Sequence, residues 1–389
     1  MQCSKCLISD SHPFGVFFDA NGICSGCNAF TNRRNALLPW NDSSSQSRLK
    51  HRFLENFQDL PNKAIVPFEP DGETWFVLEI LTELNIQPVV VYFNTQYADL
   101  KYFELLSVCQ ENFDCDFLGF SIPQELIKWC IAEELACGLG HGRKLEIFGR
   151  YISCLFVAEK LDIHHVFSGP NQQSEIVGNH NYLVANQLKL PAILKFVTGG
   201  PLLPQVQQAL NSNGSAFTTR FSAKFANYML NKIHWHHLSD YIFWDSQNIN
   251  DFFGKKFKVK PRDVNGYAEC WQASSSALKL EYFDLIRIMM TGHSKIESYL
   301  SRDIRFGRID KFGAQEALKR YLLKEWDLLG FSKFMGIDAD DVLHGLDLMN
   351  KSKRLRYHPS NFKRRPSSYS ISHHQVLFPR ASKLQIKEV

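Results

Sequence analysis

The hydrophobic pattern in the middle of the chain alternates between strand-like and helix-like segments. Residues 64–68 form a short apolar run, and residues 89–93 are continuous and rich in β-branched side chains, as in a strand covered on both faces. Between them, residues 74–84 carry apolar side chains at helical spacing. The alternation predicts a doubly wound α/β domain with a parallel sheet, whose ligand site lies beyond the carboxyl ends of the strands. Further helices are expected over 99–111, 123–134 and 145–161, and further strands over 115–120, 164–168 and 240–244.

Four cysteines near the N-terminus have the spacing of a metal site. The pattern is Cys3-x2-Cys6, seventeen intervening residues, and Cys24-x2-Cys27. Each pair can direct two thiolates at one ion, and the segment between the pairs can form a short hairpin that returns the second pair. Four soft thiolates suit tetrahedral Zn²⁺ and leave no open position. We therefore predict a structural zinc ribbon that folds together with its metal.

The cysteine spacing alone leaves two rival interpretations open. The four residues could hold an iron–sulfur cluster, or they could be four unrelated buried cysteines. His12 lies between the pairs and could replace one ligand, although we expect it to be exposed. The other six cysteines share no ligand spacing and are predicted to be mostly small core residues: Cys109, Cys115, Cys130, Cys137, Cys154 and Cys270.

Composition narrows the class of protein. Of the 389 residues, 44% are apolar and 22% are charged, which permits a large core and excludes global disorder. The longest apolar runs, such as residues 88–93, are far shorter than the roughly 20 residues that span a bilayer. The first residues also lack the apolar core of an export signal. With ten cysteines, the chain is predicted to be cytoplasmic, with reduced thiols and no membrane span.

The net charge of +4 conceals an uneven distribution. Five lysines, five arginines and one glutamate give residues 351–389 a charge of +9, so the first 350 residues carry −5. A basic, serine-rich tail can contact RNA, anionic lipid or an acidic partner, and it can equally be a solvated terminus. We predict a flexible tail and no nucleic-acid partner.

The first strand-to-helix turn of the predicted sheet is acidic. Such turns usually bind phosphate, because free backbone N–H groups and the helix dipole point into them. Here the turn reads Glu69-Pro70-Asp71-Gly72-Glu73-Thr74. Proline has no N–H to donate, and three carboxylates repel a triphosphate unless Mg²⁺ bridges them. Only Gly72 and Thr74 fit a phosphate cradle.

Several segments of the chain occur together in the order found in one protein family. They are the cysteine pattern with residues 18–24, the strand–turn–helix at 64–84, Gly169-Pro170-Asn171 with Glu175 and Gly178, Leu238-Ser239-Asp240-Tyr241 with Trp244-Asp245, and the basic segment 302–309. This set spans residues 1–350 and resembles the N-acetyl sugar amidotransferases of lipopolysaccharide and surface-polysaccharide biosynthesis, members of the PP-loop ATP pyrophosphatase superfamily. The resemblance implies a zinc ribbon, a PP-loop, Rossmann-like parallel sheet domain and a mainly helical C-terminal region.

The resemblance also implies an activity. Active members use ATP and Mg²⁺ to adenylate a carboxylate or related oxygen of a nucleotide-linked sugar, releasing pyrophosphate. Ammonia from a separate glutaminase–synthase pair then displaces AMP. The family's phosphate loop reads Ser-Gly-Gly-Lys-Asp-Ser, and no position is identical in residues 69–74 of this chain. The PP-loop is therefore degenerate.

Three hypotheses follow for the function. In the first, the protein is an amidotransferase that holds ATP through Mg²⁺ bridged to Glu69, Asp71 or Glu73. In the second, it keeps the fold, has lost ATP chemistry and serves as a scaffold or regulator in the same pathway. In the third, the zinc ribbon, the sheet domain and the basic tail serve tRNA modification.

Candidate site residues come from the resemblance and from their places at strand ends. The nucleotide candidates are Glu69, Asp71, Gly72, Glu73, Thr74, Asn94, Gln96 and Gly169. The substrate candidates are Asn171, Glu175, Arg302 and Arg305. The two arginines, with Lys295 and Arg308, would form an electropositive wall for a nucleotide-sugar diphosphate. The alternatives are a polar turn, a helix cap or a solvated helix face, and no catalytic residue is assigned.

The remaining predictions concern histidines, one helix and the domain limits. His234, His236 and His237 are predicted to lie at the surface, because adjacent histidines point in different directions and no carboxylate at i+4 completes a metal site. Residues 314–326 are predicted to form an amphipathic helix. The predicted units are the zinc ribbon (1–37), a linker and connecting helix (38–60), the PP-loop-like α/β domain (61–250), the helical region (251–350) and the basic tail (351–389).

Overall fold

The structure, a computed structural model, describes most of the predicted ribbon and sheet domain and parts of the C-terminal region. The described residues are 1–10, 12, 16–37, 47, 51, 54–55, 60–69, 71–94, 100–124, 127–128, 131, 144–169, 225, 228–229, 231–260, 262–264, 267–270, 284, 288, 293–323, 325–326, 328–336 and 385–386. Most of the predicted linker and tail lies outside these ranges. In the described part of the chain, no helix has the length and apolar character needed to cross a membrane.

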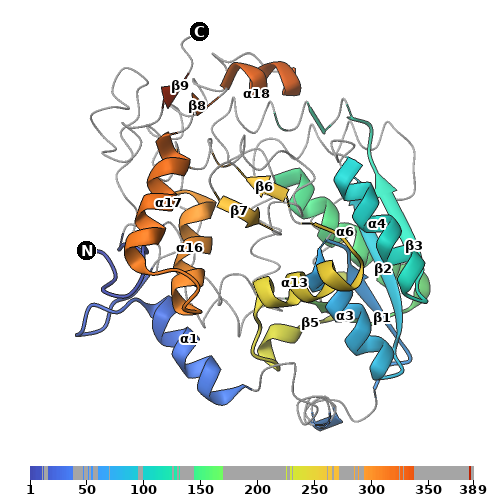
Figure 1. The fold of residues 1–389 in the computed structure, drawn as a ribbon. Coiled ribbons are helices and arrows are strands. Elements are labelled where there is room, and N and C mark those ends of the chain that lie inside the picture. The colour runs from blue at the N-terminus through green and yellow to red at the C-terminus, as the bar shows by residue number, and fades with distance from the viewer. Residues whose placement is uncertain are drawn as a thin grey trace.

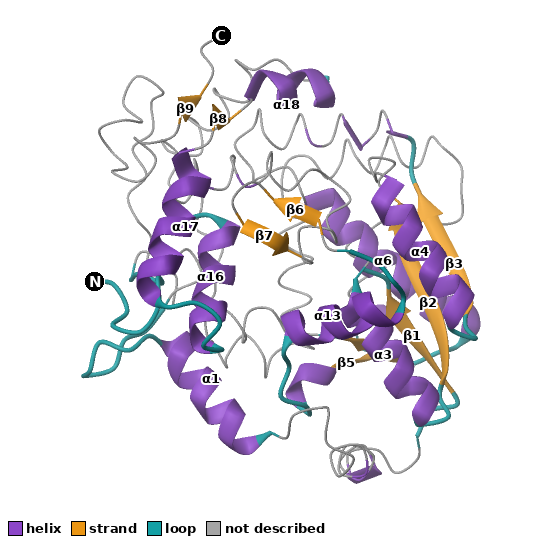
Figure 2. Ribbon diagram, in the orientation of Figure 1, coloured by secondary structure: helices purple, strands orange, loops and turns teal. Residues whose placement is uncertain are grey.

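A five-stranded parallel sheet forms the centre of the fold (Figures 1 and 2). Its strands lie in the order β3–β2–β1–β4–β5, and all four neighbouring pairs are parallel. The order reverses between β1 and β4, the kind of place where open α/β sheets bind ligands. The predicted parallel α/β sheet is therefore confirmed. The strands are β1 (Lys63–Pro67), β2 (Gln87–Asn94), β3 (Asp116–Ser121), β4 (His165–Ser168) and β5 (His234–His237).

Alternate residues of the central strands face different helices. Ala64 and Val66 belong to one apolar core, together with buried residues of the helices on that face. Because strand side chains alternate in direction, Ile65 and Val89 point to the opposite face, where α6 contacts β1 and β2. Both faces are thus apolar, as a parallel sheet between two helical layers requires. The helices are α3 (Gly72–Glu83), α4 (Leu100–Asn112) and α13 (Ser246–Lys256) on the first face, and α6 (Lys144–Leu161) on the second.

The fifth strand differs from its prediction. A strand over residues 240–244 is wrong, because Leu238–Asp240 form a 3-10 turn instead. The strand is the segment just before it, His234–His237, which pairs with β4 residue by residue. Residues 234–237 are three histidines and one tryptophan and contain no aliphatic side chain. The hydrophobic pattern therefore does not identify this segment as a buried strand.

The prediction that the histidines lie at the surface holds for His234 and is wrong for the other two. His236 and His237 are half-buried, and the ring of His236 lies 4.8 Å from that of Phe167, centroid to centroid. Burial lowers the pKa of His236 to about 3 and that of His237 to about 4. Both rings are therefore neutral at pH 7, which suits a strand that packs against the core.

The described C-terminal part is mainly helical. Asp310 accepts a hydrogen bond from the N–H of Gly313 (2.6 Å) and so fixes the start of α17 three residues before the predicted helix. The predicted helix also ends early, because Glu325–Trp326 form a short strand. The elements are β6 (Arg262–Val264), β7 (Tyr267–Cys270), α16 (Lys295–Arg305), α17 (Lys311–Leu323), β8 (Glu325–Trp326), α18 (Leu328–Met335) and, from within the predicted tail, β9 (Gln385–Ile386), which pairs with β8.

An aromatic cluster of Phe76, Trp244 and Phe253 packs α13 and the segment before it against α3. The ring of Phe76 lies 5.2 Å from that of Trp244 and 6.3 Å from that of Phe253, centroid to centroid. All three side chains are fully or almost fully buried. This packing holds Trp244 and the start of α13 against the first turn of α3.

We expect Phe76→Ala to lower the free energy of unfolding by about 3–5 kcal/mol, because it removes a buried ring and leaves a cavity. Urea denaturation followed by circular dichroism measures the change. Phe312→Ala is the matched control, since Phe312 is 72% exposed and its loss should change stability by less than about 0.5 kcal/mol. Equal losses in the two variants would contradict the aromatic cluster as a stabilising element.

Candidate metal centre and acidic turn

The N-terminal ribbon turns back on itself to present its second pair of cysteines. An antiparallel bridge joins Phe18 to Cys24. Between them, the carboxylate of Asp19 accepts two backbone N–H hydrogen bonds (both 2.9 Å), and Gly22 adopts a φ of +69°, which favours glycine. Helix α1 (Ser25–Ala36) follows immediately, so the second pair stands at a helix N-terminus.

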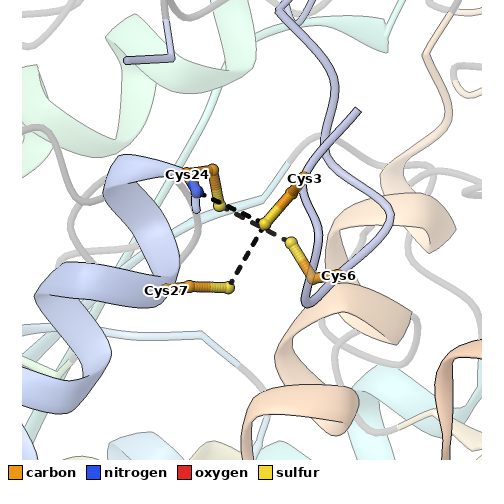
Figure 3. A group of neighbouring side chains, drawn as sticks. All are labelled: Cys3, Cys6, Cys24 and Cys27. Atoms are coloured by element: carbon orange, nitrogen blue, oxygen red, sulfur yellow. Dashed lines mark hydrogen bonds between the residues drawn. The ribbon is translucent and has the colours of Figure 1, made fainter. Parts of the chain in front are cut away.

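The four cysteine sulfurs converge on one point (Figure 3). All four lie within 4.8 Å of one another, with Cys3 Sγ 3.9 Å from Cys27 Sγ and Cys6 Sγ 3.6 Å from Cys24 Sγ. Four sulfurs at about 2.3 Å from a tetrahedral zinc ion stand about 3.8 Å apart, so these separations fit. All four residues are buried. The cluster could therefore hold a metal such as zinc in a closed, structural site.

Backbone groups support the sulfurs as thiolate ligands. Cys3 Sγ accepts hydrogen bonds from the N–H groups of Lys5 (3.4 Å) and Cys24 (3.3 Å). Hydrogen bonds with Cys27 and Cys6, and the nearby positive charge of Arg305, lower the pKa of the Cys24 thiol. Without a metal ion, hydrogen bonding within the cluster and burial raise the pKa values of Cys3 and Cys27, so the sulfurs share protons that a bound metal would displace.

Two cations from the C-terminal helices reach this centre. Arg305 Nη2 on α16 lies 3.9 Å from Cys6 Sγ and 4.0 Å from Cys24 Sγ. Lys311 Nζ on α17 donates to the carbonyl oxygen of Cys3 at 2.7 Å. The structure thus places Arg305, a substrate candidate in the sequence, beside the sulfurs. Spacing within residues 1–37 gives no signal for either contact.

His12 is buried, and the expectation that it is exposed is wrong. Its side chain is 1% exposed, and its ring lies 5.3 Å from that of His293, centroid to centroid. His293 Nδ1 in turn lies 3.2 Å from a carboxylate oxygen of Glu297 on α16. The segment that leads into α16 therefore covers this side of the ribbon. His12 does not belong to the four-cysteine group found among the described residues.

The acidic turn at residues 69–74 forms a helix cap. Asp71 caps α3, because its carboxylate accepts a hydrogen bond from the N–H of Thr74 (3.1 Å). Thr74 Oγ1 donates to the carbonyl oxygen of Glu69 (2.6 Å), and the carboxylate of Glu69 pairs with Arg150 on α6. The hydroxyl and one of the N–H groups that could have held phosphate are thus used within the turn.

Helix α13 covers the same turn. The N–H of Gly72 donates to Asn250 Oδ1 at 2.7 Å. A Cβ atom at Gly72 would lie 2.9 Å from the Cα of Asn250, so the two backbones meet too closely for any side chain at this position. Asn250 and Arg150 were not predicted, because contacts between distant segments leave no local signal in one sequence.

Glu73 is buried at the carboxyl end of β4. Its carboxylate accepts a hydrogen bond from the indole N–H of Trp244 at 2.5 Å. Burial raises the pKa of Glu73, whereas hydrogen bonds from Ser246 and Trp244 and the charge of Arg302 act against this rise. A Cβ atom at Gly169, directly after β4, would lie 3.1 Å from the ring of Trp244 and 3.7 Å from the Cβ of Glu73.

Asp71 is the most strongly shifted acid of the turn. Its side chain is 3% exposed. Burial, together with the charges of Glu73 and Glu69, raises the pKa of Asp71 well above its ordinary value of 3.8. The turn therefore favours a protonated, hydrogen-bonding carboxyl group over a metal-binding carboxylate.

The basic residues predicted as one wall have separate partners. Arg302 acts on Glu73, and Arg305 lies beside the sulfurs. Arg308 pairs with Asp245 and, at 3.4 Å, with Asp303, while Lys295 Nζ lies 5.4 Å from the ring centre of Tyr299. The cations of α16 and of the turn that follows it thus interact with different groups and do not form one wall.

The remaining candidates are only partly described. Asn94 ends β2, in register with Ser121 of β3. Gln96, Asn171 and Glu175 lie outside the described residues. Of the predicted nucleotide residues, the structure brings the acidic turn and Gly169 together around Trp244.

No family model matches the chain, and no curated protein matches it either. The resemblance to sugar amidotransferases therefore depends on the ordered segments described above. Two features that it implies are present in the structure: a parallel α/β sheet and an N-terminal four-cysteine cluster.

We expect the purified protein to contain one zinc ion per chain and Cys24→Ala to lose it, because three thiolates leave the site open to water and chelators. Metal content is measured by plasma mass spectrometry after dialysis. Cys154→Ala is the control, since this buried residue of α6 lies outside the cluster and its loss should leave the stoichiometry at one. A Cys24→Ala protein that keeps a full equivalent of zinc would contradict the site.

We expect Asp71→Asn to be more stable than the wild type at pH 8, by about 1 kcal/mol, because burial disfavours the ionised form of Asp71. The folded protein keeps a proton on Asp71 at pH values where the unfolded chain has released it. The wild type therefore loses stability as the pH rises above the ordinary pKa of 3.8, and asparagine, which also caps helices, does not. The advantage should shrink toward pH 4.

Urea denaturation at several pH values between 4.5 and 8 measures this difference. Asp114→Asn is the control, because Asp114 is exposed and should change stability by less than about 0.5 kcal/mol at every pH. Parallel stability curves for Asp71→Asn and the wild type would show that Asp71 titrates normally.

Proposed function

We propose that this chain is a sugar-amidotransferase-like protein of surface-polysaccharide biosynthesis that has lost ATP chemistry and serves as a scaffold or regulator in that pathway. The observation that carries the proposal is the occupied N-terminus of α3. The N–H groups of Gly72 and Thr74 already bond to the side chains of Asn250 and Asp71. A phosphate group at a helix N-terminus needs these donors free.

The carboxyl groups of the turn also argue against the alternative in which Mg²⁺ bridges them to ATP. Mg²⁺ requires ionised, accessible oxygens and usually keeps several waters. Asp71 and Glu73 are 3% and 4% exposed, and burial favours their protonated forms. Glu69 is paired with Arg150. The first hypothesis is therefore less well supported than the second.

The proposed partners are the glutaminase and ammonia-channelling subunits that serve an active amidotransferase. The sheet domain and the four-cysteine ribbon support this proposal, because they are the parts of an active member that would remain after the loss of phosphate binding. No observation on the described residues favours the tRNA hypothesis.

The full-length, metal-loaded protein should show no heat of binding when titrated with ATP and Mg²⁺ at millimolar concentration. It should also release no AMP or pyrophosphate in the presence of a nucleotide-linked N-acetyl sugar and ammonium. An active sugar amidotransferase measured in parallel is the positive control. ATP binding with AMP formation would overturn the proposal in favour of the first hypothesis.

Gel filtration of the protein mixed with the glutaminase and synthase subunits tests the scaffold role separately. We expect a complex that elutes ahead of each separate component. Failure to associate with either subunit, alone or together, would contradict a scaffold function even if ATP does not bind.

A further inference from the structure

The four-cysteine centre contacts two helices that lie about 300 positions later in the chain. Arg305 of α16 lies 3.9 Å and 4.0 Å from the sulfurs of Cys6 and Cys24, and Lys311 of α17 bonds to the backbone of Cys3. Ile304, next to Arg305, packs against the small apolar core of the ribbon. In Figure 1, α16 and α17 stand beside the N-terminal segment and α1.

Charge explains why cations belong there. A divalent zinc ion with four thiolates carries a net charge of −2, and all four cysteines of this cluster are buried. Burying a charge without a counter-charge costs free energy. A guanidinium is a suitable counter-charge, because it offers several N–H donors and is less strongly hydrated than an ammonium group. Arg305 reaches two of the sulfurs, and Lys311 adds a second positive charge at the first ligand loop.

The same helix also reaches the acidic turn. Arg302 precedes Arg305 by three positions, so both lie on neighbouring turns of one face of α16. Arg302 is 5% exposed, its guanidinium lies 5.3 Å from the ring centre of Tyr299, and its charge acts on the carboxyl group of Glu73. One helix thus carries one arginine at the sulfurs and another whose charge acts on Glu73.

We propose that Arg305 compensates the charge of the metal–thiolate centre, and that the bound metal thereby fixes α16 against the ribbon. Arg305 is a positioning residue in this account, because it contacts ligands of the metal and not the metal itself. The inference does not depend on the proposed function, since it requires only the cluster and α16.

Arg305→Gln tests the first half of the proposal. We expect zinc to bind about 10- to 100-fold more weakly, measured by competition with a chromophoric chelator, as for other residues that support metal ligands. In the cobalt-substituted protein, the thiolate-to-metal charge-transfer band should move to lower energy, because the sulfurs lose a stabilising positive charge. A merely structural residue would not move this band.

Arg320→Gln is the matched control, since Arg320 is exposed on α17, and it should leave both the affinity and the band unchanged. Arg305→Lys, which keeps the charge, should recover part of the affinity. Wild-type zinc affinity and an unshifted cobalt band in Arg305→Gln would overturn the charge-compensating role.

Hydrogen exchange of the wild type with and without zinc tests the second half and needs no variant. We expect amides of α16 to lose protection when zinc is removed, while β2 and β3 keep theirs. Unchanged protection of α16 would overturn the coupling. So would a uniform loss over the whole sheet, because the metal would then stabilise the fold in general.

Discussion

The arrangement of this domain depends on one close backbone approach, that of Gly72 to Asn250. Only a residue without a side chain lets α13 come this near to the start of α3, and the N–H of Gly72 is satisfied by Asn250 as a result. The approach brings Trp244 within reach of Glu73 and beside Gly169. A strand-to-helix turn, which often binds phosphate, is here part of the packed interior.

Helix α16 carries two arginines that act on different groups. Arg302 acts on the carboxyl group of Glu73 in the acidic turn, where burial and hydrogen bonding keep the carboxyl groups away from solvent. Arg305 lies beside the sulfurs of Cys6 and Cys24, which would bind a metal as thiolates. The polar face of this helix can be buried because both arginines have such groups to act on.

Sequence patterns predicted what depends on local spacing. The strands around residues 65, 90, 118 and 166, the helices α3, α4 and α6, and the convergence of the four N-terminal cysteines follow from periodicity or from ligand spacing. The misplaced fifth strand and the buried His12 depend on tertiary partners, Phe167 and His293, that no local pattern reveals. The same is true of Asn250 at the turn and of Arg305 at the sulfurs, since each is more than 170 positions from its partner.

The contact between the ribbon and α16 can form only late in the synthesis of the chain. Cys6 and Arg305 are separated by 299 positions. At ribosomal rates of about 5–20 residues per second, the cysteines wait about 15–60 s before this arginine has been made. During that interval the four thiols of the nascent ribbon lack the contacts that α16 later makes with them. Early capture of a metal ion would protect them from oxidation until the second half of the chain arrives.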